Sequence, residues 1–202
     1  MKLTNFLLKK LYLFLIIPGL LAVFCYFVGN IKVRPKEYEK VDVLVSCVDL
    51  NNKLLEEGIG NTGKVNVKEI NVNFAIYGSE SMSLVYNTIY KEMDVLIFPK
   101  TFLDQIIEAN AKYYAKLDEE VISEYVSDVT YYEYNQEKYA IKIYDATSKS
   151  GWCDTIINYS NDNFNEDYYM FFVNNSVNLG KLKGSKYDNA LTYMKAMAEY
   201  EK

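Results

Sequence analysis

The apolar residues of this chain fall into one long uninterrupted run and, after it, into many short segments. Residues 11–28 read LYLFLIIPGLLAVFCYFV, 18 residues without a charge, which is long enough to cross a bilayer. From residue 40 onward, short apolar stretches alternate with stretches whose apolar residues recur at helical spacing. The pattern therefore predicts an apolar leading segment followed by a domain of alternating strands and helices.

Apolar runs and alternating patterns predict the strands of this domain. They are expected at residues 40–48, 64–78, 94–98 and 137–145. The second of these strands has one slip of register near Glu69. Residues 154–159 and 167–176 flank a polar turn, which predicts a hairpin.

Helical spacing of apolar residues predicts the segments between the strands. Helices or helical turns are expected at residues 49–60, 79–93, 100–108, 111–125 and 186–200. Gly58 and Gly60 would close the first of them, and Ser79 is a candidate N-cap for the second. This order predicts an α/β domain with a mainly parallel sheet and helices on both faces.

The leading segment resembles an export signal, cleaved or uncleaved. Lys2, Lys9 and Lys10 precede the apolar run, as in both kinds of signal. No small-x-small cleavage pattern follows the run, and Phe24 rather than a small residue precedes Cys25, so we expect an uncleaved anchor. The expected organisation is a cytoplasmic segment at residues 1–10, a transmembrane signal anchor at 11–29, a tether at 30–40 and a domain at 41–202.

The charges beside the anchor do not decide its orientation. Three lysines precede the apolar run, and four basic residues, Lys32, Arg34, Lys36 and Lys40, follow it, so the positive-inside rule favours neither side. The export-signal layout of the first 29 residues favours a domain outside the cytoplasm. We therefore expect a single-pass protein of the cell membrane whose carboxyl-terminal domain is extracytoplasmic.

The charge of the domain argues against two classes of binding partner. Beyond residue 40 there are 15 lysines and 25 Asp plus Glu, so the formal charge is 15 − 25 = −10. An acidic domain without a basic stripe argues against nucleic acid and against an anionic membrane surface as partners.

Composition also excludes most enzyme chemistry. The chain has no His, which removes histidine acid–base chemistry and histidine zinc sites. Cys153 lacks a base to activate it, and the neighbouring Glu56 and Glu57 diverge on a helix. We expect no catalytic residues, no metal, no cofactor and no enzyme activity. Cys47 and Cys153 could pair outside the cell, but two distant cysteines give no framework, and unpaired buried thiols are favoured.

A binding site is expected where the strands end. In parallel sheets flanked by helices, ligands bind beyond the carboxyl ends of the strands. The candidate ligand-binding residues near those ends are Tyr77, Ser79, Glu80, Ser81, Phe98, Lys100, Tyr144, Asp145 and Trp152.

Each candidate also has a purely structural explanation. Ser79 and Ser81 could hold an anion at a helix start, but ordinary helix capping is favoured. Lys100 could bind a carboxylate or phosphate, or be a solvated lysine. Tyr144, Asp145 and Trp152 could form a platform for a sugar, but Trp152 packing under a loop is favoured.

The order of segments resembles the extracellular solute-binding proteins of bacterial uptake systems, which have the type II periplasmic-binding fold. Six stretches carry the resemblance: VDVLVS (41–46), INVNFAIY (70–77), DVLIFP (94–99), YYAKLD (113–118), KYAIKIYD (138–145) and YYMFFVNNS (168–176). The last of these and the closing helix correspond to the family's returning strand and final helix. The resemblance covers residues 40–200 and also implies a domain outside the cell.

The chain departs from this family in the middle. The family inserts a whole second lobe after the KYAIKIYD position, whereas here 23 residues, 145–167, lead to the returning strand. We therefore expect one lobe on a membrane anchor, acting as a non-catalytic binding or accessory protein, with a transporter membrane subunit as a candidate partner. The alternative is direct binding of a small polar solute such as a sugar for uptake.

Overall fold

The computed structural model describes residues 35–76 and 92–200. Contacts divide the chain into a unit Met1–Arg34 and a compact unit Pro35–Lys202, and the described residues belong to the second. The predicted anchor at residues 11–29 lies outside the described residues. Among the helices of residues 35–76 and 92–200, none has the length and hydropathy needed to cross a bilayer.

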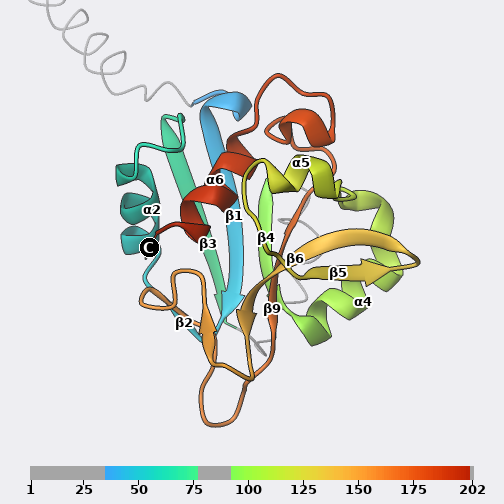
Figure 1. Ribbon diagram of the computed structural model, residues 1–202. Helices are drawn as coiled ribbons and strands as arrows, with labels where there is room; N and C mark the ends of the chain where they lie inside the picture. Colours follow the sequence, from blue (N-terminus) through green and yellow to red (C-terminus); the bar gives the residue numbers. More distant parts are fainter. Residues whose placement is uncertain (1–34, 77–91, 201–202) are drawn as a thin grey trace, which may run out of the picture. The chain divides into compact units, whose positions relative to one another are not determined.

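The domain is built on one mixed sheet with helices packed against it (Figure 1). Along the sheet the strands follow the order β3-β1-β4-β9-β6-β5, and β7 also pairs with β6. The strands are β1 (Lys40–Cys47), β3 (Glu69–Ile76), β4 (Val95–Pro99), β5 (Tyr131–Tyr134), β6 (Glu137–Asp145), β7 (Ser150–Gly151) and β9 (Tyr168–Phe172). A separate small ladder joins β2 (Asp49–Leu50) to β8 (Ile157–Asn158).

The prediction of a mainly parallel sheet is wrong. Only β3, β1 and β4 pair in parallel among the described strands. β9 returns between β4 and β6 and runs antiparallel to both, while β5 and β7 pair with β6 as antiparallel neighbours. Because β9 is inserted in reverse, β6 points in the same direction as β1, β3 and β4.

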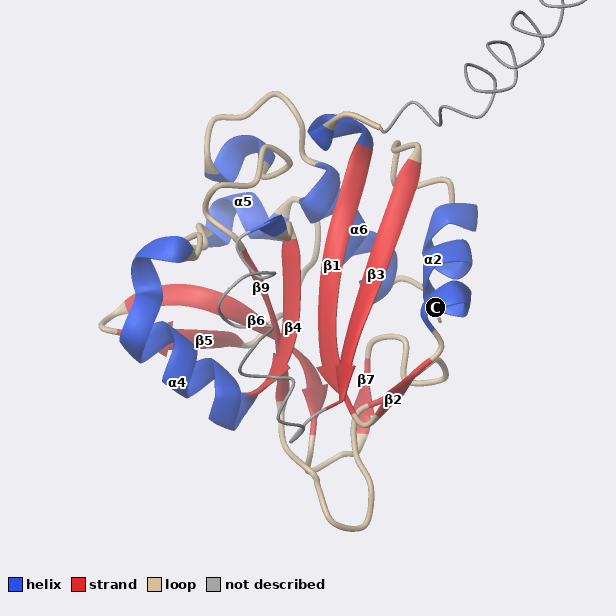
Figure 2. Cartoon of the chain, turned by 180° about the vertical axis from the view of Figure 1, so that it is seen from behind, coloured by secondary structure: helices blue, strands red, loops and turns tan. Residues whose placement is uncertain are grey.

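Helices lie on both faces of the sheet, as predicted. α2 (Asn52–Asn61) and α6 (Asn189–Ala198) cover one face, and α4 (Lys100–Asn110) covers the other (Figure 2). Strand β1 shows the two faces directly, since Val43 and Val45 enter the core beneath α2 and α6 whereas Leu44 enters the core beneath α4. The remaining helices are short: η1 (Glu37–Glu39), η3 (Ala111–Tyr113), α5 (Glu119–Ser123) and η4 (Gly180–Leu182).

Several predicted elements are confirmed and others are wrong. The strands predicted at 40–48, 94–98 and 137–145 are β1, β4 and β6 within one residue at each end. The predicted hairpin of residues 154–159 with 167–176 is wrong, because β8 pairs with β2 while β9 enters the main sheet. The helix predicted at 79–93 lies almost entirely outside the described residues.

The boundary between α2 and β3 also differs from prediction. α2 does not close at Gly58 or Gly60 but continues to Asn61, and Gly63 follows with a φ of 65°, a conformation that glycine adopts without strain. The strand predicted to start at residue 64 starts at Glu69 instead. Val65 is nevertheless buried, so its apolar side chain fills the core from a loop.

Two buried asparagines fix the start of the domain. The Asn178 side-chain amide donates to the backbone oxygens of Glu37 (3.2 Å) and Lys40 (3.0 Å). The Asn189 amide donates to the Tyr38 backbone oxygen (2.9 Å) and to Asn178 Oδ1 (3.0 Å). Residues 37–40, predicted as part of the tether at residues 30–40, are therefore bonded to the domain.

Candidate functional site

The carboxyl ends of four strands meet at one end of the sheet. Cys47 at the end of β1 pairs with Ile76 at the end of β3, and Pro99 at the end of β4 pairs with Tyr168. Tyr168 also pairs with Tyr144 near the end of β6. The charged and polar side chains here define what we call the strand-end edge: Lys100, Asp104, Tyr132, Lys142, Asp145, Glu166 and Asp167.

The sequence-predicted candidates divide into three groups. Lys100 and Asp145 lie at the strand-end edge with half and 40% of their side chains exposed. Phe98 and Tyr144 are buried in the core, and Trp152 is half-buried against it. The other four candidates, Tyr77, Ser79, Glu80 and Ser81, lie outside the described residues.

The amino terminus of α4 is already occupied by a carboxylate of the same chain. Glu166 Oε2 accepts hydrogen bonds from Thr101 N (3.0 Å) and Thr101 Oγ1 (2.7 Å). The Lys100 backbone N–H donates to the Asp167 carbonyl oxygen (2.9 Å). Free N–H groups at a helix start favour anions, so Glu166 fills the place that an external anion would take.

Lys100 is engaged by a neighbouring carboxylate. Its Nζ lies 2.7 Å from Asp104 Oδ2, and this hydrogen bond raises the pKa of Lys100. Asp104 also accepts a hydrogen bond from the Tyr132 hydroxyl (2.8 Å), and Lys100 Nζ lies 5.8 Å from the Tyr132 ring centre. Burial, with this hydrogen bond second, raises the pKa of the Tyr132 hydroxyl, so Tyr132 stays neutral. The cluster offers hydroxyl and carboxylate oxygens but little free positive charge.

Lys142 is paired with two carboxylates. Its Nζ lies 2.7 Å from Asp167 Oδ2 and 3.1 Å from Asp145 Oδ2, and the hydrogen bond to Asp167 raises the pKa of Lys142. Asp145 Oδ1 accepts hydrogen bonds from the backbone N–H groups of Thr147 and Ser148. These bonds and the one from Lys142 lower the pKa of Asp145 to about 2.

The strand-end edge carries more negative than positive charge. Its two lysines face four carboxylates, so its formal charge is 2 − 4 = −2. An anionic ligand would have to displace these carboxylates from their hydrogen bonds. The edge suits a neutral polar group or a cationic group of a partner.

The aromatic residues predicted as a sugar platform do not face solvent together. The Tyr144 ring stacks on Tyr159 at 4.7 Å, and its hydroxyl is 2.9 Å from Ser160 Oγ. The Tyr159 hydroxyl in turn donates to the Trp152 carbonyl oxygen (2.7 Å). These three rings therefore pack within or against the core.

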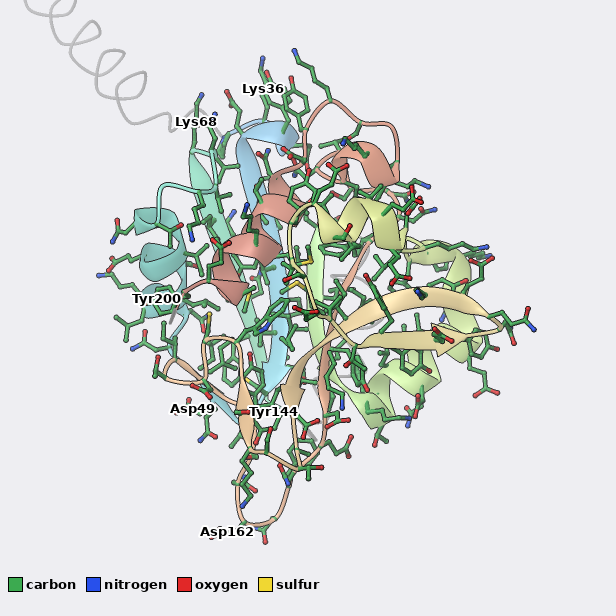
Figure 3. The ribbon with its side chains drawn as sticks, viewed as in Figure 1. Lys36, Asp49, Lys68, Tyr144, Asp162 and Tyr200 are labelled. Carbon is green, nitrogen blue, oxygen red and sulfur yellow. The ribbon has the colours of Figure 1, made fainter. Side chains whose placement is uncertain are left out.

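Residues 145–167, the segment in place of a second lobe, fold back onto the domain. β7 pairs with β6 and β8 pairs with β2, which follows β1. Cys153, Ile157 and Tyr159 are buried in the core beneath α2 and α6. In Figure 3, Asp162 marks the tip of this segment at the end of the domain where Asp49 and Tyr144 also lie.

Both cysteines of the described residues lie in the core. Cys47 and Cys153 are buried and are not joined to each other by a disulfide, as expected. Burial raises the pKa of the Cys47 thiol to about 12, so little reactive thiolate forms near neutral pH. Within residues 35–76 and 92–200, no cluster of acidic or cysteine side chains could hold a metal ion.

Comparison with other proteins adds no functional assignment. No protein-family model, curated protein or solved structure matches this chain.

Sequence reasoning missed most of the strand-end edge. These residues come from four separate parts of the sequence, and only folding brings them together: Asp104, Tyr132, Lys142, and the neighbours Glu166 and Asp167. One signal was present, since Lys142 is a charged residue in the middle of the apolar run of β6.

Proposed function

We propose that this chain is a membrane-anchored, extracytoplasmic, non-catalytic accessory protein that resembles one lobe of a solute-binding protein. It acts through contacts between its strand-end edge and another protein of the same membrane, such as the membrane subunit of a transporter. An anchor at residues 11–29 would hold the domain near that partner at high effective concentration.

The observation that supports this proposal best is the path of the chain from β6 to β9. β9 lies between β4 and β6 and runs against both, which is the position that a returning strand requires after an insertion. The insertion here is only residues 145–167, and its apolar side chains are buried in or against the core of the same domain. A second wall that could close over a solute is lacking from this stretch.

The composition of the strand-end edge favours a protein partner over a captured solute. Two-lobed binding proteins bury most of a ligand's surface by closing around it. The charged groups of this edge are instead partly exposed and already paired with one another. Such pairs at the rim of an interface set orientation and association rate more than affinity.

Photocrosslinking in the source cells tests the proposal. A photoreactive amino acid would replace Lys100 or Asp104, both on α4 and at the strand-end edge, and Glu120, on the separate helix α5, would serve as the control. The expected result is an adduct with a membrane protein from the α4 positions and none from Glu120.

Two outcomes would overturn the proposal. One is the lack of any protein adduct from the α4 positions in cells where the full chain is present in the membrane fraction. The other is saturable stabilisation of the purified full chain by a sugar, peptide or amino acid, which would favour solute binding instead.

A further inference from the structure

The end of the domain opposite the strand-end edge has a different surface chemistry. Six residues define what we call the entry end: Lys36, Tyr38, Val177, Lys183, Lys186 and Tyr187. η1, which holds Tyr38, immediately precedes the start of β1, so the entry end is separated from the strand-end edge by the length of that strand. In Figure 3, Lys36 lies at one end of the domain and Asp162 at the other.

The entry end combines stacked aromatic rings with lysines. The rings of Tyr38 and Tyr187 stack in parallel at 4.5 Å. Lys36 Nζ lies 5.6 Å from the Tyr38 ring centre, and Lys186 Nζ lies 5.6 Å from the Tyr187 ring centre. Both tyrosines are half-buried and both lysines are exposed.

An exposed apolar side chain lies on the same loop. Val177 is 42% exposed and, with Leu54, makes up the exposed large hydrophobic side chains of the described residues. Its neighbour Asn178 bonds to the backbone of Glu37 and Lys40, which ties the loop of Val177 to η1. Val177 is therefore held beside the segment that carries Lys36 and Tyr38.

Three exposed lysines of the entry end form no ion pair within the described residues, while the acidic residues beside them bond elsewhere: Glu37 and Glu39 pair with Lys40 and Lys68, and Asp188 accepts a hydrogen bond from Tyr125. Lys36, Lys183 and Lys186 form no ion pair with the acidic residues of the described ranges, unlike Lys40, Lys64, Lys68 and Lys181. The domain as a whole is acidic, and the strand-end edge has a formal charge of −2. The overall composition, which argues against an anionic membrane surface, does not show that these three lysines lie together without an ion pair to another described residue.

With the proposed anchor at residues 11–29, the bilayer would be close to this end in the sequence. The uncharged run ends at residue 28, eight residues before Lys36, which is at most about 29 Å of extended chain. Tyrosine is enriched at membrane–water interfaces, lysine extends its ammonium group to lipid headgroups, and lysines close to an anionic surface are attracted within a Debye length of about 8 Å.

We propose that the entry end docks on the anionic headgroup layer of the membrane that holds the leading segment. This inference rests on the anchored topology of the proposed function. Docking fixes the domain upright, since the Asn178 and Asn189 bonds make the entry end rigid with respect to the sheet. The strand-end edge then points away from the bilayer, toward the part of a membrane protein that projects from it.

Lipid quenching of tryptophan fluorescence in the full chain tests the docking. The chain would be reconstituted in vesicles of phosphatidylcholine with 30% phosphatidylglycerol, which carry a brominated acyl chain as quencher. Val177→Trp reports on the entry end, and Asp162→Trp is the matched control at the far end. Trp152, the one native tryptophan of the chain, gives the same background in both variants.

The expected result is at least twofold greater quenching of Val177→Trp than of Asp162→Trp. Replacing Lys36, Lys183 and Lys186 by Gln in the Val177→Trp chain should bring its quenching down to the control value. The same decrease is expected in vesicles of phosphatidylcholine alone, because the headgroup charge is then lost.

The outcomes separate this inference from the proposed function. Equal quenching of the two variants in chains that resist alkaline extraction from the vesicles would overturn the docking and leave the anchor in place. A chain that does not float with the vesicles at all would overturn the anchored topology, and the docking with it. If the quenching of Val177→Trp changes neither on replacement of the lysines nor in uncharged vesicles, the electrostatic part of the inference is overturned.

Discussion

Asn178 connects three parts of the chain through one fully buried side chain. Its amide group bonds to two backbone oxygens at the start of the domain, and its Oδ1 accepts from Asn189. Since buried polar groups are costly when left without partners, a single substitution here should disturb several groups at once.

Asn178→Ala should lower the free energy of unfolding by about 2–3 kcal/mol, because it leaves two backbone carbonyl oxygens and the Asn189 amide with fewer hydrogen bonds. Urea denaturation of the full chain in detergent measures the effect. Asn175→Ala, the same change at an exposed position of the same loop, is the control and should alter stability by less than about 0.5 kcal/mol. Equal stability of the two variants would contradict the role of Asn178.

The lowered pKa of Asp145 predicts that the stability of the domain depends on pH in the acid range. Its folded pKa of about 2 is below the ordinary value for Asp of 3.8, so its ionised form stabilises the fold above about pH 4. This contribution is lost as the pH falls through about 2.

Asp145→Asn should therefore be less stable than the unsubstituted chain at pH 5, and the difference should shrink as the pH falls from about 4 to about 2. Urea midpoints measured at several pH values in this window check the prediction. A difference that stays constant over the window would contradict the assignment of the low pKa to Asp145.

At the scale of elements, α2 protects the edge of the sheet. β3 is the outermost strand beside β1, and an outward-facing edge can pair with another chain. The Val72 N–H donates to Glu56 Oε1 (2.8 Å), and the Val72 carbonyl oxygen accepts from Asn52 Nδ2 (2.9 Å). Two side chains of one helix thus take the place of a neighbouring strand.

Replacing both Asn52 and Glu56 by Ala should destabilise the domain by about 1–3 kcal/mol and promote self-association through β3. Denaturation and size-exclusion chromatography of the full chain in detergent measure the two effects. Glu57→Ala is the control, because Glu57 lies on the same helix and forms an exposed ion pair with Lys53. A double variant that elutes and unfolds like the control would show that α2 does not protect this edge.

The elements that were predicted correctly are those with a strong local pattern. β1 and β6 are apolar runs buried on both faces, and α4 has its buried residues at helical spacing. The strand β5 was missed, because its tight turn contains Asn135 and Gln136, both with positive φ, rather than the glycine that usually marks such turns.

The errors in pairing have a physical origin beyond the local pattern. The segment 154–159 has the composition of a strand, but its backbone pairs with β2, and the paired residues Asp49 and Asn158 are 158 − 49 = 109 positions apart in the sequence. Pairing between distant segments depends on which strand edges the rest of the fold leaves unpaired. The pattern of residues 154–176 alone contains no information about β2.

At the scale of the whole molecule, the two ends of the sheet have different surfaces. The strand-end edge holds paired charges with an excess of carboxylates, and the entry end holds stacked tyrosines and unpaired lysines within the described residues. A domain with two such different ends can contact a membrane through one end and a second protein through the other. Neither surface was visible in the composition, because each gathers residues from distant parts of the chain.

We propose that this domain works through protein contacts and does not capture a solute. Thermal unfolding of the full chain in detergent, with sugars, peptides and amino acids at millimolar concentration, tests it most directly. A solute present at 100 times its dissociation constant would add about 2.7 kcal/mol, which is about 5–10 °C for a domain of this size. We predict shifts below about 1 °C for every solute. A saturable shift of several degrees that is lost in Lys100→Ala or Asp145→Ala would contradict the account.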